Sequence, residues 1–143
     1  MIAPDTNLLL YAYNPHDPLH KTAKAWLEQI LSGVEPVGFP LPTIHSFVRL
    51  LTNPAIAGRI ISLSDALDIV DEWLAPPHVS ILYPGDLHWQ WLKRTAIDGH
   101  AIVNLFPDAA IAAIATEYGA IIHTNDRDFA RFPALRWLNP LQP

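Results

Sequence analysis

Four aspartates are the residues of this sequence whose types and positions best suit chemistry. Each stands just after an apolar stretch or just before a helix-like one: Asp5, Asp108, Asp126 and Asp128. In a chain of alternating strands and helices, such positions fall at the ends of parallel strands and can meet at one sheet edge. Partly buried carboxylates lose hydration, and several gathered together need a cation between them. The sequence therefore predicts a metal site assembled from distant segments.

Carboxylate oxygens without histidine or cysteine companions favour Mg²⁺ or Mn²⁺ over zinc. The chain has no cysteine, and its seven histidines show no metal-ligand spacing. Divalent ions held by carboxylates can activate a water and stabilise the leaving oxygen in phosphodiester hydrolysis. The sequence contains no motif of a P-loop, dinucleotide-binding or serine-hydrolase site. The aspartates therefore indicate metal-dependent phosphodiester hydrolysis.

Polar residues beside the aspartates can orient waters or phosphate oxygens. They are Thr6, Asn7, Asn104 and Thr124. Each also suits a helix cap or a turn, and the same holds for Asp108 and Asp128. Both interpretations stay open for these residues. Asp5 is the exception, because a carboxylate after a four-residue first strand has little structural reason to be there.

Hydrophobic periodicity and breaker residues predict an alternation of strands and helices. Strands are expected at 1–4, 37–41, 79–82, 120–123 and 135–138, and helices at 8–13, 19–31, 43–52, 64–74, 86–95 and 108–118. This order implies right-handed crossovers and a parallel sheet with helices on both faces. The expected fold class is α/β, with a short parallel sheet flanked by helices.

Composition limits the class of protein. The chain has 143 residues, of which 50% are hydrophobic, so one compact domain spanning 1–143 is expected. The formal charge of −5 argues against a non-specific nucleic-acid coat, although bound cations would neutralise part of it. Without a signal-like start or a membrane-length apolar run, a soluble cytoplasmic protein with no membrane contact is expected. Five basic residues can contact phosphates or simply lie on solvated faces: Lys93, Arg94, Arg127, Arg131 and Arg136.

Three segments carry a resemblance to a known family. They are Asp5-Thr6-Asn7, Asn104-Leu105-x-x-Asp108-Ala-x-x-Ala-Ala, and Thr124-x-Asp126-Arg127-Asp128-Phe129-x-Arg131-Phe132 continuing through Leu135-Arg136-Trp137. Together they closely resemble PIN-domain toxins of the VapC type, and the match runs essentially end to end. The third segment is the most specific, whereas Asp-Thr-Asn alone is weak.

The resemblance implies a toxin-antitoxin ribonuclease with a three-layer α/β/α domain. Such a protein cuts an RNA substrate with Mg²⁺ or Mn²⁺, is silenced by a cognate antitoxin protein, and is commonly a homodimer. By position, Asp5, Asp108 and Asp126 carry over as metal-binding acids, and Asp128 carries over as an auxiliary acid. The helices at 19–31 and 63–74 have apolar surface for partner contacts, although core packing explains it equally well.

One position departs from the family pattern. Many members have a glutamate on the helix after the second strand, three residues before an arginine, and here Ser46 stands three residues before Arg49. No acidic residue between Glu35 and Asp65 replaces it. A serine hydroxyl can hydrogen-bond a water on the metal but supplies no charge, so one of two ions would bind more weakly or be lost. A subgroup with a similar Phe47–Pro54 stretch also often lacks this glutamate.

The leading hypothesis is a metal-dependent endoribonuclease toxin. The alternative is a catalytically weak PIN-like module that binds RNA or antitoxin without cleaving, because Ser46 leaves the site short of one carboxylate. A third class is a phosphoryl-transfer domain with an aspartate after the first strand. It is weakly supported, because Asp5-Thr6-Asn7 lacks the D-x-D pattern expected there and no suitably placed lysine is present. The sequence does not identify the RNA, the number of ions or the antitoxin.

Overall fold

The computed structural model describes residues 1–142, which form a parallel sheet between two layers of helices. The five strands are β1 (Ile2–Pro4), β2 (Val37–Pro40), β3 (Val79–Leu82), β4 (Ile121–His123) and β5 (Arg136–Leu138). The helices are α1 (Thr6–Tyr13), α2 (His20–Ser32), α3 (Leu41–Leu51), α4 (Pro54–Ala57), α5 (Leu63–Leu74), α6 (His88–Asp98) and α7 (Phe106–Glu117), with 3-10 turns η1 (Val103–Leu105) and η2 (Arg127–Arg131).

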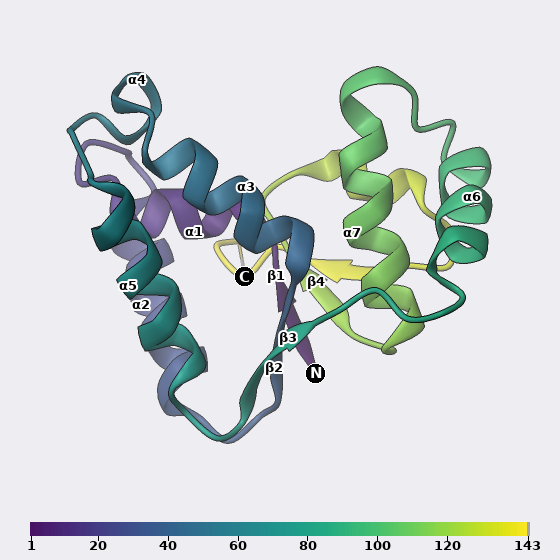
Figure 1. Cartoon of the computed structure of the whole chain (residues 1–143), viewed down its shortest axis with the longest axis horizontal. Coiled ribbons are helices and arrows are strands. Elements are labelled where there is room, and N and C mark those ends of the chain that lie inside the picture. Colours follow the sequence, from purple (N-terminus) through teal and green to yellow (C-terminus); the bar gives the residue numbers. More distant parts are fainter. Residues whose placement is uncertain (143) are drawn as a thin grey trace.

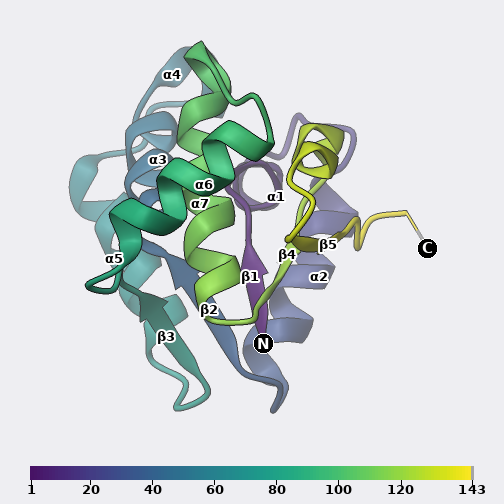
Figure 2. The ribbon, with the colours of Figure 1, turned by 90° about the vertical axis from the view of Figure 1, so that its right-hand side faces the viewer.

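The strands lie in the order β3-β2-β1-β4-β5, and every neighbouring pair is parallel. Figure 2 shows this order, with β1 at the centre of the sheet. The predicted α/β class and the three-layer architecture are therefore confirmed. Because strand side chains alternate between the two faces, Ile2 packs with α1, α2, α3 and α5, whereas Ala3 packs with α6 and α7. Figure 1 shows these two helical layers on either side of the strands.

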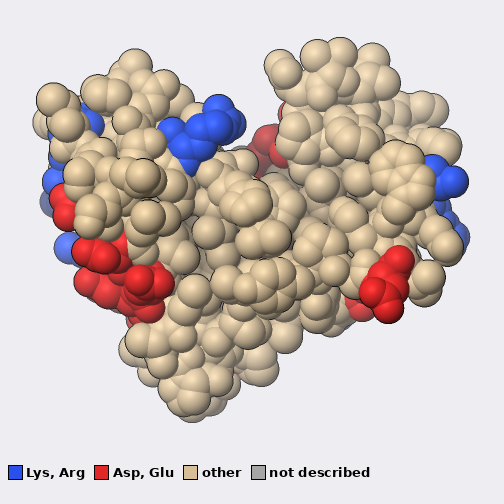
Figure 3. All heavy atoms as spheres, viewed as in Figure 1, with Lys and Arg blue, Asp and Glu red and all other residues tan. Residues whose placement is uncertain are grey.

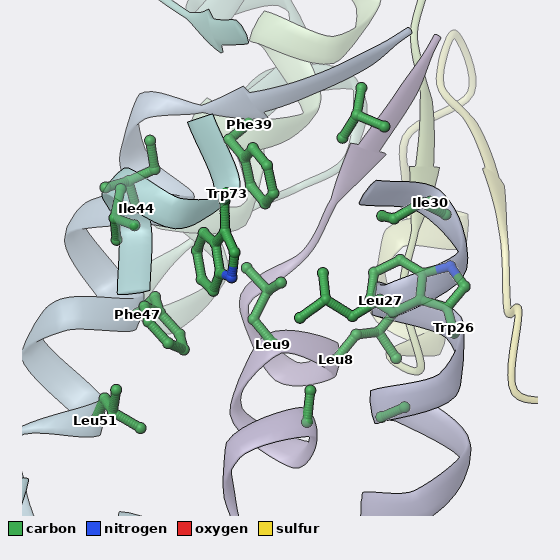
Figure 4. Packing of buried hydrophobic residues seen from close by; sticks show 14 of the residues in the cluster. Leu8, Leu9, Trp26, Leu27, Ile30, Phe39, Ile44, Phe47, Leu51 and Trp73 are labelled. Carbon is green, nitrogen blue, oxygen red and sulfur yellow. The ribbon is translucent and has the colours of Figure 1, made fainter. Parts of the chain in front are cut away.

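The two faces are packed with side chains of different size. On the α1–α3 face, Trp73 stacks on Phe39 with ring centroids 5.0 Å apart and contacts Phe47 at 4.5 Å (Figure 4). The indole nitrogen of Trp73 also donates a hydrogen bond to the Tyr13 hydroxyl at 2.9 Å. On the other face, the buried surface of α7 consists mostly of alanine and isoleucine, which lets this helix lie close to the sheet.

Element boundaries differ from the predicted ones where a capping residue was misplaced. Asp5 accepts a hydrogen bond from the Thr6 nitrogen, so α1 begins at Thr6, and the expectation that Asp5 has little structural role was wrong. The helix predicted from Ser64 begins one residue earlier, because the Ser62 hydroxyl caps the Asp65 nitrogen. Thr52 is the C-terminal cap of α3, and Asn53 caps the short helix α4, which was not predicted.

Candidate functional site

A groove of about 390 Å³ opens where the chain leaves β1 and β4, at the carboxyl end of the sheet. Figure 3 shows the molecule hollowed between α3 and α7, with basic atoms on the α3 side and acidic atoms on the α7 side. Most of the predicted site residues line this groove: Asp5, Thr6, Asn7, Ser46, Asn104, Asp108 and Asp126. Thr124 and Asp128 are the two that do not. Residues up to 121 positions apart in sequence thus share one surface.

Asp5 is the most firmly held carboxylate of the groove. Its side chain is buried, with one oxygen accepting a hydrogen bond from the Thr6 nitrogen at 2.7 Å and the other from the Thr124 hydroxyl at 2.7 Å. Burial raises the pKa of Asp5 from 3.8 to about 6, and the charge of Asp126 acts in the same direction, against the two hydrogen bonds. Asp5 is therefore a desolvated carboxyl whose orientation is set before any ligand binds.

The Thr124 hydroxyl forms its hydrogen bonds with protein groups. It donates to Asp5 and accepts from the Asn7 amide at 3.2 Å and from the Asp126 nitrogen at 2.9 Å. A hydroxyl has one proton to donate and two lone pairs, so its hydrogen-bonding capacity is filled. The side chain is also fully buried. Of the two interpretations left open for Thr124, this geometry favours the structural one, because the hydroxyl fixes Asp5.

The turn after β4 divides its two aspartates between different positions. One oxygen of Asp126 accepts a hydrogen bond from the Asp128 nitrogen at 2.8 Å, which caps η2 and aims the side chain at the groove. Asp128 itself is exposed, and its carboxylate lies 4.0 Å from the Arg131 guanidinium. Its charge still reaches the groove, because it contributes to raising the pKa of Asp108.

Asp108 lies in the first turn of α7 and is held differently from Asp5. Within residues 1–142 its side chain forms no hydrogen bond. Burial, together with the negative charges of Asp5, Asp126 and Asp128, raises the pKa of Asp108 from 3.8 to about 7, with Arg131 opposing the shift. The carboxylates are therefore close enough to repel one another, and a cation among them would relieve that repulsion.

The residues of the groove fit a hard divalent cation, although they do not form a finished cage. No group of three His, Asp or Glu side chains among the described residues converges closely enough to hold an ion unaided. Mg²⁺ commonly keeps several waters and takes only one or two carboxylates, so a complete cage is not required. The hydroxyl of Thr6 is buried on the groove wall without a hydrogen-bond partner, which leaves it available to such a water.

The α3 wall contains a residue that the sequence did not single out as a site residue. Arg49 lines the groove one helical turn after Ser46, and it faces the same space as the aspartates. Its spacing of three from Ser46 was visible in the sequence, but the closeness of α3 to α7 was not. None of the five basic residues considered from sequence lines the groove, and Arg131 and Arg136 bond instead to the backbone carbonyls of Gly99 and Gly119.

Comparison with known proteins places this geometry in context. The PIN domain family model matches residues 2–135. The chain is 36% identical to Ribonuclease VapC33 of Mycobacterium tuberculosis over 142 residues, 99% of each chain, and 37% identical to VapC ribonuclease Mb2897 of Mycobacterium bovis over 141 residues, 99% of this chain and 96% of that one. The structure of VapBC2 from Rickettsia felis, solved bound to a DNA fragment from the VapBC2 promoter, is similar to this one with a TM-score of 0.69. The match covers 97% of this chain and 98% of that one at 20% sequence identity, so it shows a shared fold.

Proposed function

This chain belongs to the PIN-domain family, and we propose that it is a ribonuclease toxin of the VapC type that hydrolyses RNA phosphodiester bonds. Relatives that share 36–37% of its residues over nearly the whole chain are ribonucleases of that type. The observation that carries the proposal is the gathering of Asp5, Asp108 and Asp126 in one groove at the carboxyl end of the sheet. The alternative of a module that binds without cleaving is not favoured, because these relatives are ribonucleases along their full length.

The proposed metal ligands are Asp5, Asp108 and Asp126, and the proposed ion is Mg²⁺ or Mn²⁺. The raised pKa values of Asp5 and Asp108 support this assignment, because they report negative charge concentrated in a partly desolvated site. A divalent ion bound there supplies Lewis-acid stabilisation of phosphoryl oxygens and lowers the pKa of water. Asp128 is proposed as an auxiliary acid that acts through its charge and through the backbone bond that orients Asp126.

The remaining groove residues position ligands. The Thr124 hydroxyl holds Asp5 at a fixed angle, so the carboxylate does not have to reorganise when substrate arrives. The unpartnered Thr6 hydroxyl and the exposed Asn104 amide are available to a water or a phosphate oxygen. Ser46 supplies a hydroxyl but no charge on the α3 wall, so this wall adds no carboxylate to the ion site.

Cleavage assays with chelator test the proposal. Purified protein incubated with total bacterial RNA should produce discrete fragments in Mg²⁺ or Mn²⁺ and none in EDTA. Asp108→Asn should greatly reduce the fragments while calorimetry shows weaker Mn²⁺ binding than in the unaltered protein. Cleavage that persists in EDTA, or in Asp108→Asn at full rate, would exclude these aspartates as the metal site.

We also propose a cognate antitoxin and a second copy of the chain as partners. Support comes from the solved VapBC complex of similar fold and from apolar side chains left exposed on α4, α5 and the segment between them: Ile56, Ile60, Leu63 and Leu67. In contrast, the apolar face of α2 is buried in the core, so core packing explains that helix. Light scattering of the purified chain should give the mass of a dimer, and Leu67→Glu should shift it to a monomer.

No helix in the described part of the chain combines the length and apolarity that a membrane crossing requires.

A further inference from the structure

The groove has two walls of opposite charge. The α7 side and the β4 turn contribute Asp108 and Asp126, and the α3 wall contributes Arg49 with Ser46 beside it. Among residues 1–142, Arg49 forms no ion pair and no hydrogen bond through its side chain. The other arginines bonded in the structure point to carboxylates or carbonyls outside the groove, so Arg49 is the cation that this groove presents to a ligand.

We propose that Arg49 is a substrate-positioning residue that binds a backbone phosphate of the RNA on the α3 wall, opposite the carboxylates. The inference rests on the proposed ribonuclease function and adds a phosphate subsite to it. A guanidinium presents a planar fork of donors that matches a phosphate, and it stays charged at every relevant pH. The buried, unpartnered hydroxyl of Thr6 lies on the same groove and offers a further contact to an oxygen ligand.

Ser46 makes this arrangement possible. Residues three apart on a helix are neighbours, so a carboxylate at position 46 would lie beside Arg49 and neutralise it. With serine there, the positive charge of Arg49 is not consumed within the protein. The missing acid thus changes the role of the α3 wall from a second set of metal ligands to a phosphate contact.

The charge of the whole molecule makes a local cation important. The chain carries a formal charge of −5, and the groove concentrates part of it in mutually repelling carboxylates, so the net charge opposes the approach of an RNA strand. A strand that crosses the groove therefore needs an anchor outside the acidic side. Arg49 is exposed at that position, where it can contact a phosphate without first leaving another partner.

The salt dependence of RNA binding tests the assignment directly. A fluorescein-labelled RNA hairpin is titrated in EDTA with Asp108→Asn protein, which removes cleavage and one repelling charge, over a series of KCl concentrations. Adding Arg49→Ala should weaken binding about tenfold and lower the slope of log K against log salt by about 0.7, the value for one phosphate contact. Arg49→Lys should restore the slope but only part of the affinity, because it keeps the charge and loses the fork.

Two further variants separate a phosphate contact from general effects. Arg94→Ala removes the same charge from the exposed face of α6, outside the groove, and should leave affinity and slope close to the reference. Ser46→Glu should weaken RNA binding by pairing with Arg49, without raising Mn²⁺ stoichiometry or cleavage. Gain of cleavage and of a second Mn²⁺ in Ser46→Glu would overturn the proposal. The α3 wall would then be part of a metal site that lacks one carboxylate, and not a phosphate contact.

Cleavage kinetics distinguish failure of this inference from failure of the proposed function. In otherwise unaltered protein with Mn²⁺, Arg49→Ala should raise KM about tenfold and change kcat little, as expected for a contact made equally in ground and transition states. If the unaltered protein cleaves RNA and Arg49→Ala has an unchanged KM and salt slope, the phosphate subsite is excluded and the ribonuclease assignment stands. If the unaltered protein does not cleave in any metal, the ribonuclease assignment fails, while the binding titration still decides the role of Arg49.

Discussion

The sheet edge formed by β1 and β4 and the start of α7 are the two sides of the groove that supply carboxylates, and they hold these carboxylates in opposite ways. At the β1–β4 edge, Asp5 is buried and both of its oxygens are hydrogen-bonded, through a threonine hydroxyl that also fixes the following turn. At the start of α7, Asp108 is half-buried, lacks such bonds within the described residues and follows a strained 3-10 turn. The edge of the sheet therefore provides a rigid anchor, and the start of α7 provides a carboxylate that no hydrogen bond within residues 1–142 restrains.

The largest expected effect comes from removing the charge of the rigid anchor. Asp5→Asn should lower RNA cleavage by about a thousandfold, because the site loses a preoriented negative group that nothing else replaces. The melting temperature should also fall, because the amide replaces one of two accepting oxygens with an NH2 group that faces a donor, but the protein should remain folded at the assay temperature. Cleavage rates in Mn²⁺ together with thermal unfolding measure both quantities.

Asp71→Asn is the matched control for this change. Asp71 lies exposed on α5, away from the groove, and its neutralisation alters the net charge by the same amount. Its activity and Mn²⁺ affinity should equal those of the unaltered protein. An Asp5→Asn protein that binds Mn²⁺ normally and loses only a few-fold in rate would show that the fixed carboxylate is not essential.

The hydroxyl that orients the anchor should matter for stability as well as rate. Thr124→Val leaves a carboxylate oxygen, the Asn7 amide and the Asp126 nitrogen without their partner. Because unsatisfied buried groups destabilise by about 1–3 kcal/mol, we expect a loss near the upper end of that range. Cleavage should fall about 10- to 100-fold, as for residues that orient metal ligands. Urea unfolding and initial rates report the two effects.

Thr116→Val provides the comparison for a local hydroxyl. Within residues 1–142, the Thr116 hydroxyl donates only to the Ala112 carbonyl, four residues earlier on α7, and that carbonyl keeps its place in the helix. Its replacement should cost less than about 1 kcal/mol and leave cleavage unchanged. Equal losses in the two variants would mean that Thr124 contributes as an ordinary core residue and does not position Asp5.

The raised pKa values of Asp5 and Asp108 should make the stability of the protein depend on pH. The pKa values of Asp5 and Asp108 in the folded protein are about 6 and about 7, above the ordinary value of 3.8. Between the ordinary and the raised pKa of each group, the folded state therefore binds more protons than the unfolded state. Stability from these groups is therefore lost as the pH rises from about 4 to about 7. In EDTA, Asp108→Asn should melt a few degrees above the unaltered protein at about pH 8, and by less at about pH 5. An offset that is equal at both pH values would contradict the charge assignment.

The difference between the two sides also explains what could be predicted from the sequence. Asp5, Asp108 and Asp126 were selected because strand ends and helix starts are marked by local patterns, and alternating elements bring such positions to one edge. The structure does place them on one groove. The order of strands and the closeness of α3 to α7 depend on packing between distant segments, so the exposure of Arg49 to the groove was not predictable.

Hydrogen-bond partners were even less accessible from sequence. The role of Thr124 stayed open between orienting a water or phosphate oxygen and capping a turn, because nothing local indicates that its hydroxyl contacts residues 117 and 119 positions away. Asp5 was expected to have little structural role, because its position was explained by the metal site. The same carboxylate also caps α1. Local rules thus locate the acids, and tertiary contacts decide which are fixed.

The smallest expected effect concerns the strained turn that precedes Asp108. Val103 has φ of 53°, a left-handed conformation that costs a β-branched residue about 1–2 kcal/mol, and its exposed side chain contributes little packing. Val103→Gly removes this strain but gives the unfolded chain more freedom, worth about 0.5–1 kcal/mol, so we expect a net stabilisation of at most about 1.5 kcal/mol. Ile102→Gly is the control, because Ile102 is equally exposed but has φ of −96° and should only destabilise. If urea unfolding shows both glycines to be equally destabilising, the turn before Asp108 stores no strain, and the two sides of the groove differ in their hydrogen bonds alone.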